Sequence, residues 1–226
     1  MCNPACKAYG QSRLVVSNVQ GKRVIEVGSR NVNGSLRSHV EQLGPASYLG
    51  VDIEAGPGVD EVCDAEDLVA RFGVASFDLA VCTEVLEHVR DWRTVIANLK
   101  QLLDADGVLL ITTRSVGFPY HAFPYDFWRY EVDDMRTIFA DMTIEDVDTD
   151  PGAPGVFITV RRPSELVESD LADVELYSMI KRRRCRDISD FDLDVFTKKR
   201  RALQLGGKLL PPKIKNFVKG ERAPSA

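Results

Sequence analysis

The stretch RVIEVG at residues 23–28 is a short, mostly apolar run that ends at a glycine, and it decides the fold of the chain. Apolar residues at successive positions are typical of a parallel strand that is buried on both faces and enters a turn. In residues 35–43, which follow, the apolar positions 36, 40 and 43 fall on one helical face. This stretch therefore predicts a strand, a glycine turn and a helix.

The alternation of strands and helices continues along the chain. The pattern predicts strands at residues 48–53, 61–63, 77–82 and 108–112, and helices at residues 66–72 and 91–103. Strands separated by helices of this length form βαβ units, so the sheet should be parallel with helices on both faces. Two further strand-like segments, residues 142–147 and 155–160, flank a turn-rich stretch and predict an antiparallel pair that closes the sheet.

These elements predict an α/β domain over residues 20–162, built on a doubly wound, mostly parallel sheet of seven strands with an antiparallel closing strand. A loop and a short helix in residues 1–19 precede this domain. Residues 163–226 have the pattern of a charged helical extension with two helices. Glycine and proline punctuate its end, which is expected to be loosely ordered.

Composition limits the class of protein. The chain has 226 residues, 44% of them apolar, which is enough to bury one sizeable core. No run approaches the roughly 18 apolar residues that a membrane-spanning helix needs, and the N-terminal residues lack the order of a secretory signal. We therefore expect a cytoplasmic protein without a membrane span. The five cysteines are an odd set, and disulfides are not expected.

Charge is distributed unevenly along the chain. The net charge is −5, yet residues 179–226 carry 14 Lys and Arg residues against 5 Asp and Glu residues. The acidic remainder is not expected to bind nucleic acid, whereas the basic tail can lie on an anionic surface. A solvated tail is the simpler interpretation and the favoured one.

Candidate ligand-binding residues lie at four strand ends, because open parallel sheets bind their ligands there. The turn after the first strand contains Glu26, Gly28, Ser29 and Gly34. Its glycines let the backbone approach a ligand, and the following helix offers free amide groups. The alternative is a glycine-rich turn that binds nothing.

The second and third strand ends carry carboxylates. Asp52, followed by Ile53, lies at a spacing from Glu26 that suits an adenosine cofactor, because a carboxylate there can accept hydrogen bonds from both ribose hydroxyls. Asp64 and Ala65 follow the third strand, where a side-chain acceptor can meet the amino group of an adenine. N-capping explains an acidic residue in front of a helix equally well.

The fourth strand end is the most informative. FDLAVCTEVLEHV at residues 77–89 and LDADGVLLI at residues 103–111 resemble the class I S-adenosylmethionine-dependent methyltransferases. The resemblance runs in the same order of elements through most of the predicted domain. Thr83, in the first of these stretches, is therefore included among the predicted cofactor contacts.

The resemblance implies a binding site for S-adenosylmethionine. From the methionine end through the ribose to the adenine, the implied contacts are Glu26, Gly28, Gly34, Asp52, Asp64 and Ala65. The family's glycine loop has glycines at every second position, whereas Arg30 and Val32 stand there and Gly34 follows later. We expect a longer loop with Ser29 among its contacts. The chain also lacks the G-x-G-x-x-G spacing of nicotinamide enzymes.

Two histidines are candidate bases: His88, after the fourth strand, and His121, in the aromatic loop of residues 117–130. Methyl transfer from a sulfonium mainly requires alignment and exclusion of water, and a base is needed only if the acceptor must lose a proton. The loop is too aromatic to be left in water. We expect it to form a lid or an acceptor wall, and the alternative is a structural plug over the sheet edge.

Glu84, Glu87 and His88 have the Glu-x-x-Glu-His spacing, which resembles the metal-binding stretch of the ubiquinone-pathway O-methyltransferases and of the methyltransferases that modify the 2′-hydroxyl at small-RNA ends. A divalent ion such as Mg²⁺ bound there could hold two acceptor oxygens, and His121 could complete its shell. In other relatives with a similar Leu-Glu-His-Val, these side chains make local hydrogen bonds, which is the alternative.

The sequence thus predicts an enzyme that methylates an oxygen or nitrogen of an unidentified acceptor, with small molecules or glycan-type metabolites ahead of macromolecules. Two alternatives stay open. One is an RNA-modifying enzyme that uses a metal and the basic tail, which salt-dependent RNA affinity would indicate. The other is a catalytically silent cofactor-binding module that acts as an interaction partner, which methyl turnover would exclude.

Overall fold

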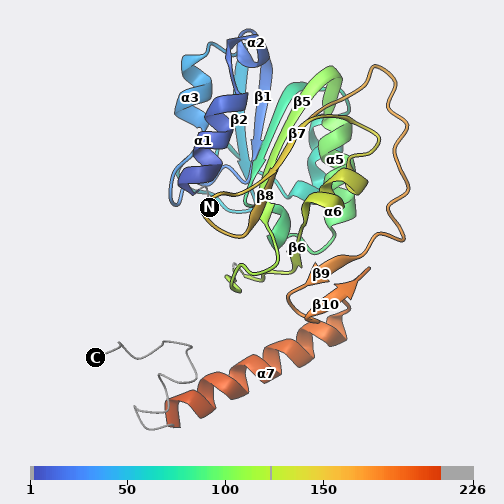
Figure 1. The fold of residues 1–226 in the computed structure, drawn as a ribbon. Helices are drawn as coiled ribbons and strands as arrows, with labels where there is room; N and C mark the ends of the chain where they lie inside the picture. The colour runs from blue at the N-terminus through green and yellow to red at the C-terminus, as the bar shows by residue number, and fades with distance from the viewer. Residues whose placement is uncertain (1–2, 123, 210–226) are drawn as a thin grey trace. The chain divides into compact units, whose positions relative to one another are not determined.

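The computed structural model describes residues 3–122 and 124–209 of the chain. The chain divides into two compact units, Met1–Arg186 and Asp187–Ala226. The first is an α/β body and the second contains a single described helix (Figure 1). Among the described residues, no helix is long and apolar enough to cross a membrane.

The body begins with two helices, α1 (Pro4–Arg13) and α2 (Val16–Val19), and then alternates strands and helices. The next elements are β1 (Arg23–Val27), α3 (Arg37–Gln42), β2 (Ser47–Asp52), β3 (Glu61–Val62), the 3₁₀ turn η1 (Ala65–Asp67), α4 (Leu68–Phe72), β4 (Phe77–Thr83), the 3₁₀ turn η2 (Leu86–His88) and α5 (Trp92–Leu102). They are followed by β5 (Leu103–Arg114), β6 (Trp128–Arg129), α6 (Val132–Ile138), β7 (Thr143–Thr149), β8 (Gly155–Arg161), β9 (Leu176–Ser178) and β10 (Arg183–Cys185).

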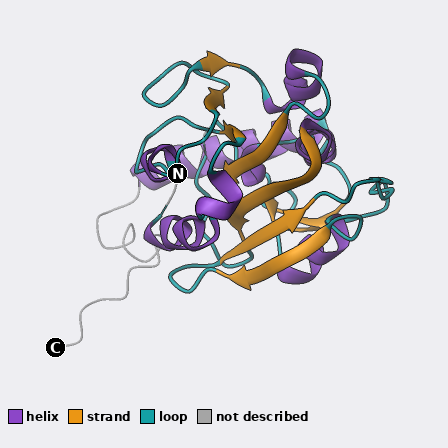
Figure 2. Ribbon diagram, turned by 90° about the horizontal axis from the view of Figure 1, so that it is seen from above, coloured by secondary structure: helices purple, strands orange, loops and turns teal. Residues whose placement is uncertain are grey.

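Seven strands form the main sheet in the order β3-β2-β1-β4-β5-β8-β7. Neighbouring strands from β3 to β5 are parallel, and β8 runs antiparallel to both β5 and β7. Helices lie on both sides of this sheet, as the view from above in Figure 2 shows. The predicted doubly wound fold with an antiparallel closing strand is confirmed.

The core explains why the strand ends are held in place. Val24 of β1, Leu79 of β4 and Leu110 of β5 are buried in one apolar cluster with Leu36 and Val40, two of the positions on the predicted helical face. A fully buried side chain of this size contributes about 1.5–3 kcal/mol. The cluster therefore anchors β1 and β4, between which the strand order reverses.

A second sheet has three short strands in the order β10-β9-β6. It includes residues 176–185, which lie in the stretch for which two charged helices are predicted without bounds and which form strands instead. Strands of two or three residues show no hydrophobic alternation, and β6 lies inside the stretch that the sequence presents as an aromatic loop. Pairing buries Leu176 and Ser178 of β9 completely.

Of the two helices predicted beyond residue 162, the described residues contain one, α7 (Asp190–Leu209). Ser189 and Asp192 cap the N-terminus of α7 with two reciprocal hydrogen bonds. The Ser189 N–H donates to the Asp192 carboxylate at 2.9 Å, and the Asp192 N–H donates to Ser189 Oγ at 3.2 Å. Acidic residues in its first turn suit the helix dipole. The end that was predicted to be loosely ordered begins at Gly206: its residues 206–209 belong to α7, and the rest lies outside the described residues.

Ending the chain after Arg162 should destabilise the body, whereas ending it after Arg186 should not. The shorter chain lacks β9 with its buried Leu176, and it lacks two backbone carbonyls that accept hydrogen bonds from Arg93 at 2.8 and 2.7 Å. Removal of a buried Leu side chain alone destabilises a protein by about 2–5 kcal/mol. Urea unfolding of the two truncated chains measures the difference, and equal midpoints would show that β9 adds no stability.

Candidate active site

A cavity of about 480 Å³ opens at the carboxyl ends of β1, β2 and β4. It lies at the reversal of strand order between β1 and β4, where open α/β sheets bind ligands. Its volume is typical of small-molecule and cofactor sites. Eight of the predicted residues line it: Gly28, Asp52, Ile53, Asp64, Ala65, Glu84, His88 and His121.

The turn after β1 requires a glycine. Gly28 has a φ of 77°, and a Cβ at this position would lie 2.1 Å from Cγ2 of Val85. The N–H groups of Gly28 and Ser29 both donate to the carbonyl of Val51, at 2.9 and 3.0 Å. Ser29 is buried, and its hydroxyl has no hydrogen-bond partner among the described residues. These bonds fix the backbone of the turn where Gly28 borders the cavity, and the Ser29 hydroxyl is the buried group next to it in the chain.

Gly34 ends the longer loop that the sequence predicts. It has a φ of 124°, and its N–H donates to Oδ1 of Asn31 at 2.9 Å. A Cβ at Gly34 would lie 3.4 Å from Nζ of Lys7, so α1 brings an ammonium group over this loop. Sequence reasoning missed Lys7, because no periodicity or spacing connects α1 with the glycine loop.

Four predicted cofactor contacts do not line the cavity: the buried Glu26, Ser29 and Thr83, and the half-buried Gly34. The Glu26 carboxylate accepts hydrogen bonds from the hydroxyls of Tyr48 and Ser35. Burial raises the pKa of Glu26 to about 7, although the hydrogen bond from Tyr48 acts against this rise. Glu26 therefore supports the turn from inside the sheet instead of facing the cavity.

The two carboxylates at the ends of β2 and β3 are held in place by the backbone. Asp52 accepts from the N–H groups of Arg30 and Glu54, each at 3.2 Å, and its side chain lines the cavity. Asp64 accepts from the N–H of Glu66 at 3.0 Å and so caps η1. The capping interpretation of Asp64 is confirmed, and the same side chain also borders the cavity.

Glu84 lines the cavity, but its carboxylate belongs to a buried network. The residue has a φ of 58°, in the left-handed region. It forms an ion pair with Arg114, and it accepts hydrogen bonds from Sγ of Cys6 at 3.2 Å and from the hydroxyl of Thr112 at 3.0 Å. Arg114 also donates to Asp150 at 3.3 Å. The network connects the end of β4 with α1 and β5.

Glu87, His88 and His121 offer ligand atoms that all lie within 4.8 Å of one another. The buried Glu87 carboxylate accepts from the hydroxyl of Thr113 at 2.9 Å through Oε2. Its other oxygen, Oε1, has no hydrogen-bond partner among the described residues, and it lies 4.0 Å from Nε2 of His88 and 3.6 Å from Nε2 of His121. The structure thus brings together three of the four predicted metal ligands, and the Glu84 carboxylate is engaged elsewhere.

The contact of His88 with Tyr125 fixes its tautomer. Nδ1 of His88 lies 2.7 Å from the carbonyl oxygen of Tyr125, and a carbonyl only accepts, so Nδ1 carries a proton. In neutral His88 the lone pair is therefore on Nε2, the nitrogen that faces Glu87. That atom can accept a proton or bind a metal ion.

His121 is held between two carboxylates. Its Nδ1 lies 3.0 Å from Oδ2 of Asp126, and Asp126 is itself paired with the buried Arg129. Burial lowers the pKa of His121, but the carboxylates of Asp126 and Glu87 outweigh burial and raise that pKa to about 9. Without a bound metal, His121 is an imidazolium at neutral pH and cannot act as a base.

Of the residues that complete this site, sequence reasoning did not find Cys6, Lys7, Arg114 or Asp126. Two of them carried a usable signal. Asp126 is the single acidic residue in residues 117–130 and precedes Arg129 by three positions. Arg114 ends a strand on the side where ligands bind.

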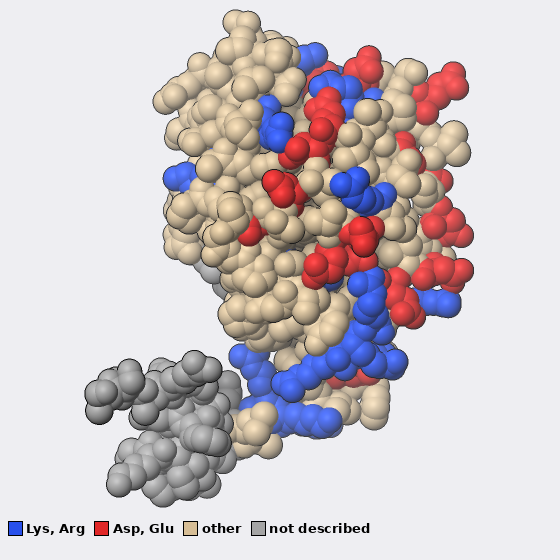
Figure 3. Space-filling model, viewed as in Figure 1, with Lys and Arg blue, Asp and Glu red and all other residues tan. Residues whose placement is uncertain are grey.

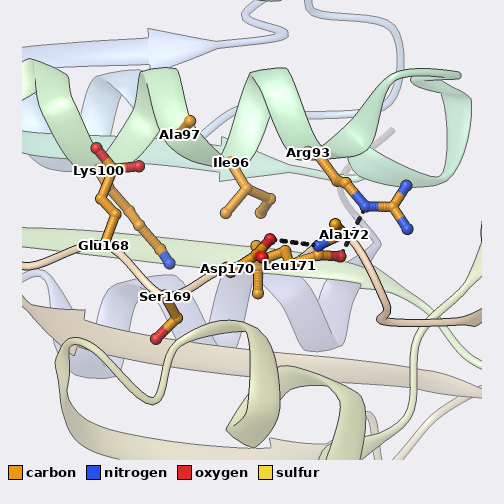
Figure 4. Close-up of a pocket in the computed structure, with 9 residues that line it drawn as sticks. All are labelled: Arg93, Ile96, Ala97, Lys100, Glu168, Ser169, Asp170, Leu171 and Ala172. Atoms are coloured by element: carbon orange, nitrogen blue, oxygen red, sulfur yellow. Dashed lines mark hydrogen bonds between the residues drawn. The ribbon is translucent and has the colours of Figure 1, made fainter.

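A smaller hollow of about 270 Å³ lies between α5 and residues 168–172 (Figure 4). Lys100, at its inner end, is buried and forms an ion pair with Asp141 at 2.8 Å. Arg93, at its other end, donates to the carbonyl of Leu171 at 2.8 Å. Arg93 thus attaches the segment after β8 to α5 directly, and Lys100 does so through Asp141, whose carboxylate also accepts from the Ser169 N–H at 2.9 Å, which gives the hollow a structural role.

Replacing Asp126 by Asn should lower the pKa of His121 from about 9 toward its usual value near 6.5, because one of its two carboxylate partners is lost. Since folding raises this pKa, the stability that His121 contributes is complete below about pH 6.5 and is lost as the pH rises through about 9. NMR titration of the imidazole measures the midpoint. Asp133→Asn, on the exposed side of α6, is the matched control, and a midpoint near 6.5 in the parent would contradict the assignment.

A family model described as a methyltransferase domain matches residues 7–144. The ubiquinone biosynthesis O-methyltransferase of Idiomarina loihiensis is 30% identical over 106 residues, which are 41% of this chain and 42% of that protein. The enzyme of the same name from Xanthomonas euvesicatoria is 33% identical over 125 residues, 49% of each chain. The chain therefore spans about half the length of the curated relatives it matches.

Solved structures show the same fold at low identity. The 1,6-didemethyltoxoflavin-N1-methyltransferase of Burkholderia thailandensis, with bound 1,6-didemethyltoxoflavin and S-adenosylhomocysteine, has a TM-score of 0.56 and 20% identity, covering 71% of this chain and 79% of that one. The N-methyltransferase NodS of Bradyrhizobium japonicum, in complex with S-adenosylhomocysteine, has a TM-score of 0.53 and 17% identity, covering 71% and 89%. Since the matching family model covers more than half of the chain, the protein belongs to the methyltransferase-domain family, and it has the class I methyltransferase fold.

Proposed function

We propose that this enzyme methylates an oxygen atom of a small molecule. The observation that carries the proposal is the orientation of His88, which lines the cavity. Its Nδ1–H is fixed on the Tyr125 carbonyl, so the lone pair is on Nε2, the nitrogen that faces Glu87. Such a group can remove the proton that a hydroxyl loses on methylation. The names of the relatives, which are O-methyltransferases, support an oxygen acceptor. The cavity volume supports a small one.

The cavity suits S-adenosylmethionine, which supplies the methyl group when it is bound. Gly28 borders the cavity with bare backbone, and Asp52 presents a carboxylate that its backbone partners already orient. We place the methionine end near Ser29, Gly34 and the ammonium of Lys7. Asp52 and Ile53 would hold the ribose, and Asp64 with Ala65 would border the adenine.

Replacing Asp52 by Ala should weaken binding of S-adenosylhomocysteine by about 1.5–3 kcal/mol, the contribution of hydrogen bonds to a charged group. The fold should be kept, because the Asp52 carboxylate accepts, among the described residues, only from the backbone N–H groups of Arg30 and Glu54. Calorimetry measures the affinity, and Glu54→Ala in the same turn is the control. Unchanged affinity in the Asp52 variant would place the ribose elsewhere.

In this proposal His88 acts on the acceptor and His121 supports it. His88 Nε2 takes the acceptor proton, and the Tyr125 carbonyl stabilises the opposite N–H as positive charge develops. The aromatic residues around His121 exclude water and align the acceptor, which is the main requirement of an in-line transfer. Glu26 and Thr83 would contribute by holding the strand ends that carry the cofactor contacts.

A metal ion bound by Glu87, His88 and His121 is the alternative to His88 as a base, because the single lone pair on His88 Nε2 cannot bind a metal and accept a proton at once. The unpartnered Oε1 of the buried Glu87 faces both imidazoles. Asp126 would orient His121 from behind, as carboxylates do for metal-binding histidines. Two imidazoles and one carboxylate suit Zn²⁺ or Mn²⁺ better than Mg²⁺, which prefers oxygen ligands. The ion would act as a Lewis acid on the acceptor oxygen.

Single variants separate the base from the metal. With a metal, Glu87→Gln, His88→Asn and His121→Asn should each abolish stoichiometric Zn²⁺ or Mn²⁺ binding, which calorimetry or elemental analysis detects without any turnover. Glu84→Gln should keep it, because the Glu84 carboxylate is paired with Arg114.

If His88 acts as a base without a metal, a chelator should have no effect, and His88→Asn should lower turnover by about two to four orders of magnitude at unchanged cofactor affinity. His39→Asn, outside the cavity, is the matched control. Full turnover of His88→Asn in the presence of a chelator would contradict both roles.

A further inference from the structure

The turn between β9 and β10 is strongly basic. Residues 181–184 are Lys-Arg-Arg-Arg, and Arg186 follows β10. In Figure 3, Lys and Arg side chains gather at the end of the body that carries these strands. The methyl-transfer mechanism leaves this concentration of positive charge without a role.

Two of these arginines have acidic partners and two do not. Arg184 is paired with Asp134, and Arg186 is paired with Asp173 at 2.9 Å. Arg182 and Arg183 are exposed, and they form no ion pair with an acidic side chain of the described residues. Two exposed positive charges at successive positions raise the local electrostatic potential, so a bound anion would lower the electrostatic energy of the turn.

Hydrogen bonds connect this turn with the candidate active site. The N–H of Met179 donates to the carbonyl of Phe127 at 2.8 Å, and the N–H of Phe127 donates to the carbonyl of Glu87 at 2.7 Å. The indole N–H of Trp128, the first residue of β6, donates to the carbonyl of Arg90 at 3.1 Å, and Arg90 lines the cavity. Hydrogen bonds thus connect the β9–β10 turn, through residues 127 and 128, with residues at the acceptor end of the cavity.

We propose that Arg182 and Arg183 bind a phosphate group of the methyl acceptor, and that the acceptor is therefore a phosphorylated small molecule. This inference rests on the proposed function. A guanidinium presents a planar pair of N–H donors that matches phosphate oxygens, and two adjacent guanidiniums balance the charge of a phosphate dianion. A long polyanion is disfavoured, because residues 1–178 carry 29 acidic against 15 basic residues and would repel it.

Binding of pyrophosphate, measured by calorimetry at constant ionic strength, tests the proposal on the full-length chain. The variant Arg182→Ala/Arg183→Ala should bind pyrophosphate roughly tenfold more weakly, because charge-assisted hydrogen bonds are lost. Lys22→Ala/Arg71→Ala removes two charges elsewhere on the body and should bind as the parent does. Saturation with S-adenosylhomocysteine should leave pyrophosphate binding intact, since the two sites differ.

Equal binding by the parent and the Arg182/Arg183 variant would overturn the proposal, and so would competition between pyrophosphate and S-adenosylhomocysteine. Tighter binding of a single-stranded RNA than of pyrophosphate, lost in the same variant, would overturn the small-molecule acceptor in favour of RNA. Failure of the proposed function has a separate signature: the parent would bind no S-adenosylhomocysteine while the variant still lost pyrophosphate. In that outcome an anion site stands, but its assignment to a methyl acceptor is wrong.

Discussion

The carboxylate of Glu87 is the group around which the acceptor end of the molecule is arranged. It is completely buried, and one of its oxygens has no hydrogen bond within the described residues. A buried charge is tolerated only when opposite charge lies close to it. His121 supplies that charge and is kept protonated by Asp126, which in turn requires Arg129. A chain of alternating charges thus extends from the end of β4 into the aromatic loop.

The same reasoning explains why Glu84 and Glu87, three positions apart, differ in role. The left-handed backbone at Glu84 turns its side chain away from the histidines and toward Arg114, a partner that ends β5. Cys6 and Asp150 complete that second network, which ties α1 to the sheet. Burial and repulsion by Glu87 raise the pKa of Glu84 to about 9, although Arg114 acts against this rise. Of the two buried acids, Glu87 is therefore the one that carries the charge at neutral pH.

The sequence was sufficient for the sheet and for much of the cavity, because both depend on local patterns. Buried strands appear as apolar runs, and parallel topology then places strand ends such as Asp52, Asp64 and His88 at one edge. The direction in which Glu26 points was not predictable, since a strand buried on both faces carries no mark of which face adjoins the ligand. The φ of Glu84 has no sequence signature, because any residue can be forced into this region by its surroundings. Strand β9 was missed because its pairing with β6 is a tertiary contact.

The two ends of the cavity are built by different means, and this has a consequence for specificity. Short turns after β1, β2 and β3 form the proposed cofactor end, and each turn follows directly from the strand before it. The acceptor end depends on long-range hydrogen bonds, from His88 to the Tyr125 carbonyl and from Phe127 to the Glu87 carbonyl. The strand β6 and its partner β9 extend these contacts outward. Changes in the loop or in the second sheet can therefore alter the acceptor surface while the turns at the other end, which follow directly from β1, β2 and β3, keep their geometry.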